Sequence, residues 1–256
     1  MGALSSTDPC PNCGAPGVDR FCPSCGQDNR RARLELKPVL GETLETLVGW
    51  ESALVATLRG LVVDPGGMVK DYVEGRRRRY VNPARFCLLS LALWFLVMKG
   101  FDLDALRDMG FKITSTGAEP GSERMLFAED LRRFLGSNLQ VLLYVTLPLE
   151  ALLLRVAFRR SGRNLAENLA LVLYLAGFSY LLGLVAAPFQ ALGLELARPV
   201  RVLISFVWLV RAVRGFHGAG WVSAILRSLL VSFGHVVGTV IVFILVGIPV
   251  VALRRS

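Results

Sequence analysis

Long apolar runs separated by short basic clusters dominate the chain from about residue 83 onward. Two of these runs, residues 168–194 and 228–253, contain 27 and 26 residues without Asp, Glu, Lys or Arg. A helix needs roughly 20 apolar residues to cross the hydrocarbon core of a bilayer. These two runs therefore predict two membrane crossings.

Three weaker runs predict further crossings. In residues 83–101, only 13 residues lie between Arg85 and Lys99, a length of about 20 Å, so both basic side chains must reach toward the interfaces. Residues 197–213 are the weakest run, because only nine uncharged residues separate Arg201 from Arg211. We expect an all-α transmembrane bundle over residues 83–256. Its five crossings are 83–101, 139–158, 165–192, 197–213 and 228–253.

The segments before the bundle are more polar. We expect a disordered tail over residues 1–9, a small metal-binding head over 10–27, a linker over 28–37 and cytosolic amphipathic helices over 38–82. Apolar residues recur at the helical period between 38 and 75, with a bend expected near Gly49, and Pro65-Gly66-Gly67 predicts a turn before a short helix at 68–74. The segment fits a hairpin on the membrane or against the bundle; the alternative is a partner-binding groove.

Composition agrees with a membrane protein that binds the lipid bilayer. The chain is 53% hydrophobic with a mean hydropathy of +0.51, too apolar for an ordinary soluble domain. Its net charge of +9 would suit nucleic acid, but the basic residues cluster at the ends of apolar runs. That placement favours an anionic inner leaflet over nucleic acid. The densest cluster is Arg76, Arg77, Arg78 and Arg79, an expected basic interface with the membrane.

The basic clusters also predict the orientation of the bundle. Residues 1–30 contain no apolar signal-peptide core, so the N-terminus is expected on the cytoplasmic side. With five crossings, the clusters at 76–85, 155–163 and 211–227 all fall inside, as the positive-inside rule requires. Arg254 and Arg255 would then end outside. A model with four crossings brings them inside but leaves the basic residues from Arg198 to Arg227 outside.

Two cysteine knuckles in the head carry the most specific chemical signal. They are Cys10-Pro11-Asn12-Cys13-Gly14 and Cys22-Pro23-Ser24-Cys25-Gly26. Four thiolates on two tight turns suit one tetrahedral ion, and their closed shell leaves no position for a substrate. Cys10, Cys13, Cys22 and Cys25 are therefore the expected ligands of a structural Zn²⁺ in a zinc ribbon. Iron is a less favoured occupant, and disulfides or redox thiols are the remaining alternative.

Three ionisable residues lie inside the predicted crossings: Glu150, Arg155 and His235. Such groups are expensive in a membrane and often functional, so they form a candidate intramembrane polar site. Glu150 suits either an interhelix hydrogen bond or a proton or ion role. Glu150 and Arg155 are five positions apart, on different faces of an ideal helix, so we do not pair them. His235 suits a packing or capping role, and His217 is expected in a solvated loop over residues 214–221.

The order of these motifs resembles the bacterial membrane proteins of the domain of unknown function 3667 family. The resemblance rests on the double knuckle, Asp71-Tyr72-Val73-Glu74-Gly75-Arg76, Arg79-Tyr80-Val81-Asn82-Pro83, and Arg159-Arg160-Ser161-Gly162-Arg163-Asn164 with Glu167. It implies a bacterial inner-membrane protein with a cytosolic zinc-ribbon head, and it brings no known activity. Relatives often carry histidines where this chain has Asn168, Tyr174 and Ala176. A membrane site built on those histidines is therefore not expected here.

Together these features predict an integral inner-membrane protein, not an enzyme, whose zinc-stapled head docks a cytosolic protein partner or regulates the bundle. The alternative is a small transporter or channel that uses Glu150 and neighbouring polar residues. An intramembrane enzyme is the third reading, because no nucleophile with a base is present. The oligomeric state has no signal in the sequence.

Overall fold

A computed structural model describes residues 9–16, 21–27, 50–108, 119, 121–194 and 196–253. Within these residues the regular structure is helical, and no strand exceeds a single bridge residue. The predicted linker, the start of the amphipathic segment with its expected bend near Gly49, and the C-terminal arginines lie outside the described residues.

The described chain forms seven helices of nine residues or more. They are α2 (Trp50–Val63), α3 (Pro65–Val73), α4 (Pro83–Gly100), α6 (Glu123–Ala157), α7 (Leu165–Ala191), α8 (Ala197–His217) and α9 (Trp221–Leu253). Shorter elements are the 3-10 turns η1 (Arg77–Arg79) and η2 (Arg159–Ser161) and the single-turn helix α5 (Ala105–Asp108).

Local side-chain caps fix where two of the membrane helices begin. At α4, the Asn82 side chain accepts from the amides of Ala84 and Arg85, and Pro83 occupies the first helical position. At α7, the Asn164 side chain accepts from the Glu167 amide and the Glu167 side chain accepts from the Asn164 amide, which is a capping box. Both helices therefore start at the end of a basic segment.

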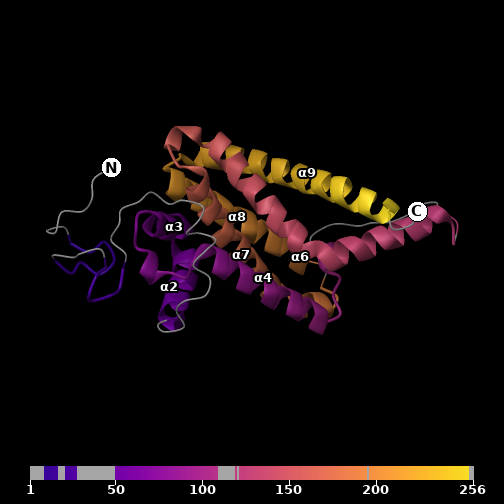
Figure 1. Cartoon of the computed structure of the whole chain (residues 1–256), viewed down its shortest axis with the longest axis horizontal. Coiled ribbons are helices and arrows are strands. Elements are labelled where there is room, and N and C mark those ends of the chain that lie inside the picture. Colours follow the sequence, from indigo (N-terminus) through magenta and orange to yellow (C-terminus); the bar gives the residue numbers. More distant parts are fainter. Residues whose placement is uncertain are drawn as a thin grey trace.

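Helix α7 is the centre of the bundle. It contacts α4, α6 and α8 along its length, while α9 packs against α6 and α8 (Figure 1). Its residue Tyr174 is fully buried, donates a hydrogen bond to the Val81 carbonyl and meets the Tyr72 ring edge-on at 5.6 Å. The core thus joins the membrane helices to α3 and the start of α4.

Three stretches of helix are long and apolar enough to cross a membrane: Arg77–Gly100, Leu165–Ala191 and Trp221–Leu253. A fourth is the bent pair Glu123–Leu139 and Val141–Ala157, whose halves differ in direction by 70°. These helices indicate a membrane protein. Helix α8 also forms in the fourth predicted crossing, but it is not among the described helices that meet these criteria.

Two local predictions were wrong. Pro65-Gly66-Gly67 does not form the turn itself but is the first turn of α3, capped by Asp64, whose carboxylate accepts from the Gly67 amide at 3.0 Å. Residues 214–217 are not a loop: α8 continues to His217 and ends at Gly218, which has a left-handed φ of 66°. In both places the helix extends about one turn beyond the residue that composition suggested: α3 begins at Pro65, and α8 ends at His217.

The bundle has two distinct ends. Helices α2 and α3 lie at the end where α4 and α7 begin, and the C-terminal end of α9 points toward the other (Figure 1). Hydrogen bonds from Trp208 Nε1 to the Leu61 carbonyl and from Arg211 to the Val63 carbonyl tie the C-terminal part of α8 to the first end. Arg201, near the start of α8, instead contacts Asp108 on α5. Helix α8 therefore runs from one end of the bundle to the other.

Candidate functional site

The two cysteine knuckles have the same backbone geometry. In each knuckle the amide of the first cysteine donates to a carbonyl five residues later, from Cys10 to Ala15 at 2.8 Å and from Cys22 to Gln27 at 2.9 Å. The glycine after each second cysteine adopts a positive φ, 75° at Gly14 and 67° at Gly26, which glycine tolerates without steric cost. This repeated turn directs both sulfurs of each pair to the same side.

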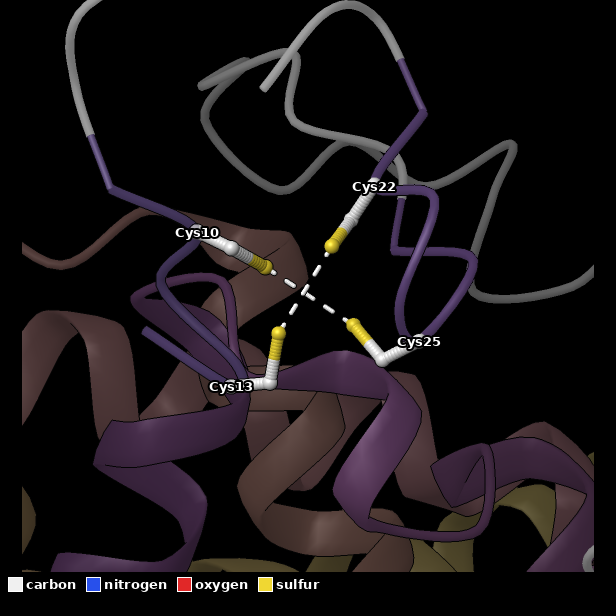
Figure 2. Close-up of side chains that lie close together, drawn as sticks. All are labelled: Cys10, Cys13, Cys22 and Cys25. Atoms are coloured by element: carbon white, nitrogen blue, oxygen red, sulfur yellow. Dashed lines mark hydrogen bonds between the residues drawn. The ribbon is translucent and has the colours of Figure 1, made fainter. Parts of the chain in front are cut away.

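The four sulfurs converge on one point (Figure 2). Sγ of Cys10 lies 3.7 Å from Sγ of Cys25, Sγ of Cys13 lies 3.6 Å from Sγ of Cys22, and all four atoms lie within 4.8 Å of one another. A tetrahedral ion with metal–sulfur bonds of about 2.3 Å separates its ligands by about 3.8 Å. The cluster therefore fits a metal ion held by four cysteines, and all of these thiols are free of disulfides.

The cluster is closed by its own loops. Cys10 and Cys22 are buried, Cys25 is half-buried and Cys13 is exposed at the edge. Four protein ligands complete a tetrahedral shell, so a bound ion has no open position for water or substrate. The chemistry that this arrangement supplies is structural.

The second cysteine knuckle rests on the arginine cluster. The Arg78 amide donates to Gln27 Oε1 and the Arg78 Nε to the Gly26 carbonyl, both at 3.2 Å. A Cβ atom at Gly26 would lie 2.5 Å from Arg78 Nη2, so a larger residue would displace this guanidinium. Gln27, which makes the first contact, is buried. The second knuckle thus packs directly on η1, immediately before α4.

The other arginines of this cluster also have partners within the protein. Arg76 pairs with Asp71 at 3.1 Å, and the Arg79 guanidinium lies 5.6 Å from the centre of the Tyr80 ring. Arg76, Arg78 and Arg79 remain exposed, which leaves their outer surfaces free to meet a lipid headgroup layer.

The structure brings Glu150 and His235 together and leaves Arg155 apart. His235 Nδ1 on α9 lies 3.4 Å from Glu150 Oε2 on α6, and both side chains are half-buried. Arg155 is exposed, and no ion pair described in the structure includes it. Helices α6 and α9 pack closely around the Glu150–His235 pair. A Cβ atom at Gly238 would lie 2.3 Å from the Leu149 side chain, and one at Gly234 would lie 3.1 Å from the Leu153 side chain. These glycines let α9 approach α6 beside Glu150.

A buried ion pair at the other end of the bundle was not predicted. Arg201 on α8 contacts Asp108 Oδ2 at 2.9 Å, and Gln190 donates to the other Asp108 oxygen at 2.8 Å. The sequence contained one indication of this pair, an arginine inside the weak run 197–213. Its partner Asp108 lies 93 residues earlier, in the connection between α4 and α6. Sequence spacing does not link two such segments.

His217 is not the solvated loop residue that we expected. Its ring stacks on Phe158 at 4.6 Å between centroids, and its Nδ1 lies 2.8 Å from the Ser161 hydroxyl. Burial lowers the pKa of this imidazole to about 4, with further lowering by the positive charges of Arg163 and Arg227. His217 is therefore neutral at physiological pH.

Two of the positions at which the family resemblance would place histidines are packed into the bundle. Asn168 is fully buried and donates to the Asn164 carbonyl, and Tyr174 fills the core described above. In the part of the chain that the structure describes, the four cysteines are the one group of three or more His, Cys, Asp or Glu residues arranged to hold a metal ion.

Comparison with known proteins gives a single kind of match. No significant match was found among curated proteins or among solved structures. Residues 51–95, which run from α2 through η1 and most of α4, match the family model described as a protein of unknown function (DUF3667). This segment contains the Asp71–Arg76 and Arg79–Pro83 strings that carry the resemblance. Over these residues the match supports the resemblance to the domain of unknown function 3667 family that the sequence predicts.

Proposed function

We propose that the chain is a non-enzymatic integral protein of the bacterial inner membrane, with a structural Zn²⁺ in a cytosolic head that docks a protein partner or regulates the bundle. One observation carries the proposal: the four-cysteine cluster packs through Arg78 on the turn that leads into α4. The head is thereby in direct contact with the turn that precedes the membrane helix α4. This position suits a module whose folded state influences the bundle.

Zinc is the proposed ion because four thiolates at tetrahedral spacing favour it over harder cations. Rubredoxin-type iron has the same ligands and is the competing occupant. We also propose that the head is a zinc ribbon. The two turns formed by its described residues support this fold.

Five crossings with the N-terminus inside are the proposed topology. Helix α8 has 21 residues, a length of about 32 Å, which matches the hydrocarbon core. The charge that weakens this run is compensated, because Arg201 is paired with Asp108 and Arg211 donates to the Val63 carbonyl. Those contacts lower the cost of carrying α8 across the bilayer.

Crosslinking from the head tests the docking role. A photo-crosslinking side chain in the head of the full-length protein should capture one cytosolic protein in cells. Cys22→Ser, which removes a metal ligand, should abolish the capture, whereas Cys87→Ala on α4 should retain it. Equal capture by the Cys22→Ser protein would refute a role for the folded head.

A transporter or channel is the second candidate, and the Glu150–His235 contact of 3.4 Å is the observation that favours it. A carboxylate beside an imidazole inside a bundle is a pair through which a proton can pass. In reconstituted vesicles, Glu150→Gln should abolish a proton flux that Arg155→Gln preserves, because Arg155 lies apart from the pair. An unchanged flux in Glu150→Gln would exclude this role.

A further inference from the structure

A pocket of about 330 Å³ opens where α3, the α6–α7 connection and the end of α8 meet. The residues that give it chemical character are Lys70, Ser161, Arg163, Glu167 and His217. It lies at the end of the bundle that carries the α2–α3 hairpin, and it shares no residue with the cysteine cluster or the Glu150–His235 pair. The function proposed above does not use it.

His217 presents an unfilled hydrogen-bond position in this pocket. The Ser161 hydroxyl donates to the Phe158 carbonyl at 2.8 Å, so Nδ1 of His217 carries the ring proton and donates to Ser161 Oγ. Nε2 is then a lone-pair acceptor. This atom is buried and has no hydrogen-bond partner among the described residues. A ligand that offers one O–H group to Nε2 would remove the cost of leaving a buried polar atom unsatisfied.

The pocket also has a positive wall. Lys70 and Arg163 line it, and Arg227 is close enough to act on the His217 charge. Its acidic neighbours have other roles: Glu167 accepts from the Asn164 amide at 2.8 Å in the capping box, and Glu74 pairs with Arg163 at 3.2 Å. The pocket therefore suits a ligand that carries negative charge and also one proton to donate.

We propose that this pocket binds a phosphate monoester group. The second pKa of a phosphate monoester is about 6, so its monoanion is still accessible near neutral pH. This form offers anionic oxygens to Lys70 and Arg163 and one O–H to His217 Nε2. Sulfate has no such proton, and a phosphodiester headgroup has none either. The same group occurs on phosphatidic acid in the inner leaflet and on soluble cytosolic phosphates. Basic pockets between membrane helices on the cytoplasmic side commonly bind lipid head groups.

The two histidines of the chain make the test direct, because ring ¹⁵N labelling of the full-length protein gives signals from His217 and His235 only. In detergent, inorganic phosphate and glycerol phosphate should shift the His217 signals, and sulfate should not. The apparent pKa of His217 should rise from about 4 by at least one unit, because the anion offsets the charges of Lys70, Arg163 and Arg227. The His235 signals serve as the internal reference.

Two substitutions and nanodiscs of two lipid compositions complete the test of phosphate binding. Lys70→Gln, an exposed side chain, should weaken phosphate binding at least tenfold, whereas Arg160→Gln, an exposed arginine on η2 outside the pocket, should leave it unchanged. In nanodiscs, a response to phosphatidic acid but not phosphatidylglycerol would identify a lipid ligand; a response to soluble phosphate alone would identify a soluble one. An equal response to sulfate, a Lys70→Gln protein that binds as the wild type does, or no response to any phosphate would overturn the proposal.

Discussion

Asp108 and Arg201 form the most deeply buried ion pair in the described part of the chain, with side chains 1% and 10% exposed. The pair joins α5 to α8, and Gln190 of α7 satisfies the second carboxylate oxygen. A Cβ atom at Gly183 would lie 3.0 Å from Arg201 Nη1, so the guanidinium also fits closely against α7. An arginine that looked costly in the sequence is therefore accommodated by three segments.

Removal of one partner should destabilise the protein strongly. Arg201→Gln leaves the Asp108 carboxylate buried without its counter-ion, and such losses typically cost about 3–5 kcal/mol. Thermal unfolding of the purified protein should occur at a clearly lower temperature. Arg198→Gln is the matched control, because this half-buried neighbour donates to the Arg107 backbone carbonyl and forms no ion pair among the described residues. Equal melting temperatures for Arg201→Gln and the wild type would show that the pair is not structurally important.

Residues differ in how far the sequence reveals them. The cysteine cluster could be predicted because each knuckle is a local turn, and the repeated Cys-x-x-Cys-Gly spacing fixes where its sulfurs point. The Glu150–His235 contact could not be predicted, because it depends on the register in which α9 packs along α6. Gly234 and Gly238 set that register only once the facing leucines are known. Tertiary contacts of this kind have no signature in residue spacing.

At the scale of elements, the α2–α3 hairpin is held against the bundle by a close helix contact. A Cβ atom at Gly66 would lie 2.7 Å from both the Ala212 carbonyl oxygen and the Gly215 Cα, so α3 and α8 touch backbone to backbone. The apolar stripe predicted an amphipathic hairpin but left its site open, on the membrane or against the bundle. The glycines of α3 and α8 explain why the hairpin packs on the bundle.

Gly66→Ala should separate α3 from α8. The added methyl group meets backbone atoms that cannot rotate away, and overpacking of this kind typically costs about 1–3 kcal/mol. Hydrogen exchange should become faster in α3 and at the C-terminal end of α8, while α4 and α7 change little. Gly220→Ala is the control, since a Cβ atom there meets nothing within 4 Å. Unchanged exchange in α3 of the Gly66→Ala protein would argue against this contact.

The contacts of α8 explain why its sequence gave the weakest predicted crossing. Hydropathy ranks α8 low because Arg201 and Arg211 interrupt it, yet the helix forms over 21 residues and reaches both ends of the bundle. Mean hydropathy over a stretch of sequence counts each charged side chain but takes no account of the group that pairs with it in the fold. Asp108 and the Val63 carbonyl are those partners, and they come from segments far away in the sequence.

On the scale of the whole molecule, the direction of α8 decides the topology. With five crossings and an inner N-terminus, the connection after α8 lies in the cytoplasm, beside α2, α3 and the α6–α7 connection. The contact of 2.8 Å between His217 and Ser161 supports this arrangement, because it joins the end of α8 to η2, which directly follows α6.

A topology reporter inserted after Gly220 should therefore give a cytoplasmic signal. Reporters after Gly162 and after Gly121 supply the reference signals, cytoplasmic and external respectively. A periplasmic signal after Gly220 would remove α8 from the set of crossings and favour the model with four.

The central claim is that one metal ion, held by four cysteines, stabilises the head of this membrane protein, and metal content per purified chain tests it most directly. We expect one zinc ion per wild-type chain, the same for Cys87→Ala, and none when Cys13 and Cys22 are both replaced by serine. Loss of the ion should leave the apolar helices folded, since the cysteine cluster and the main core are separate. A wild-type protein without bound metal, or a double serine variant that retains it, would contradict the account.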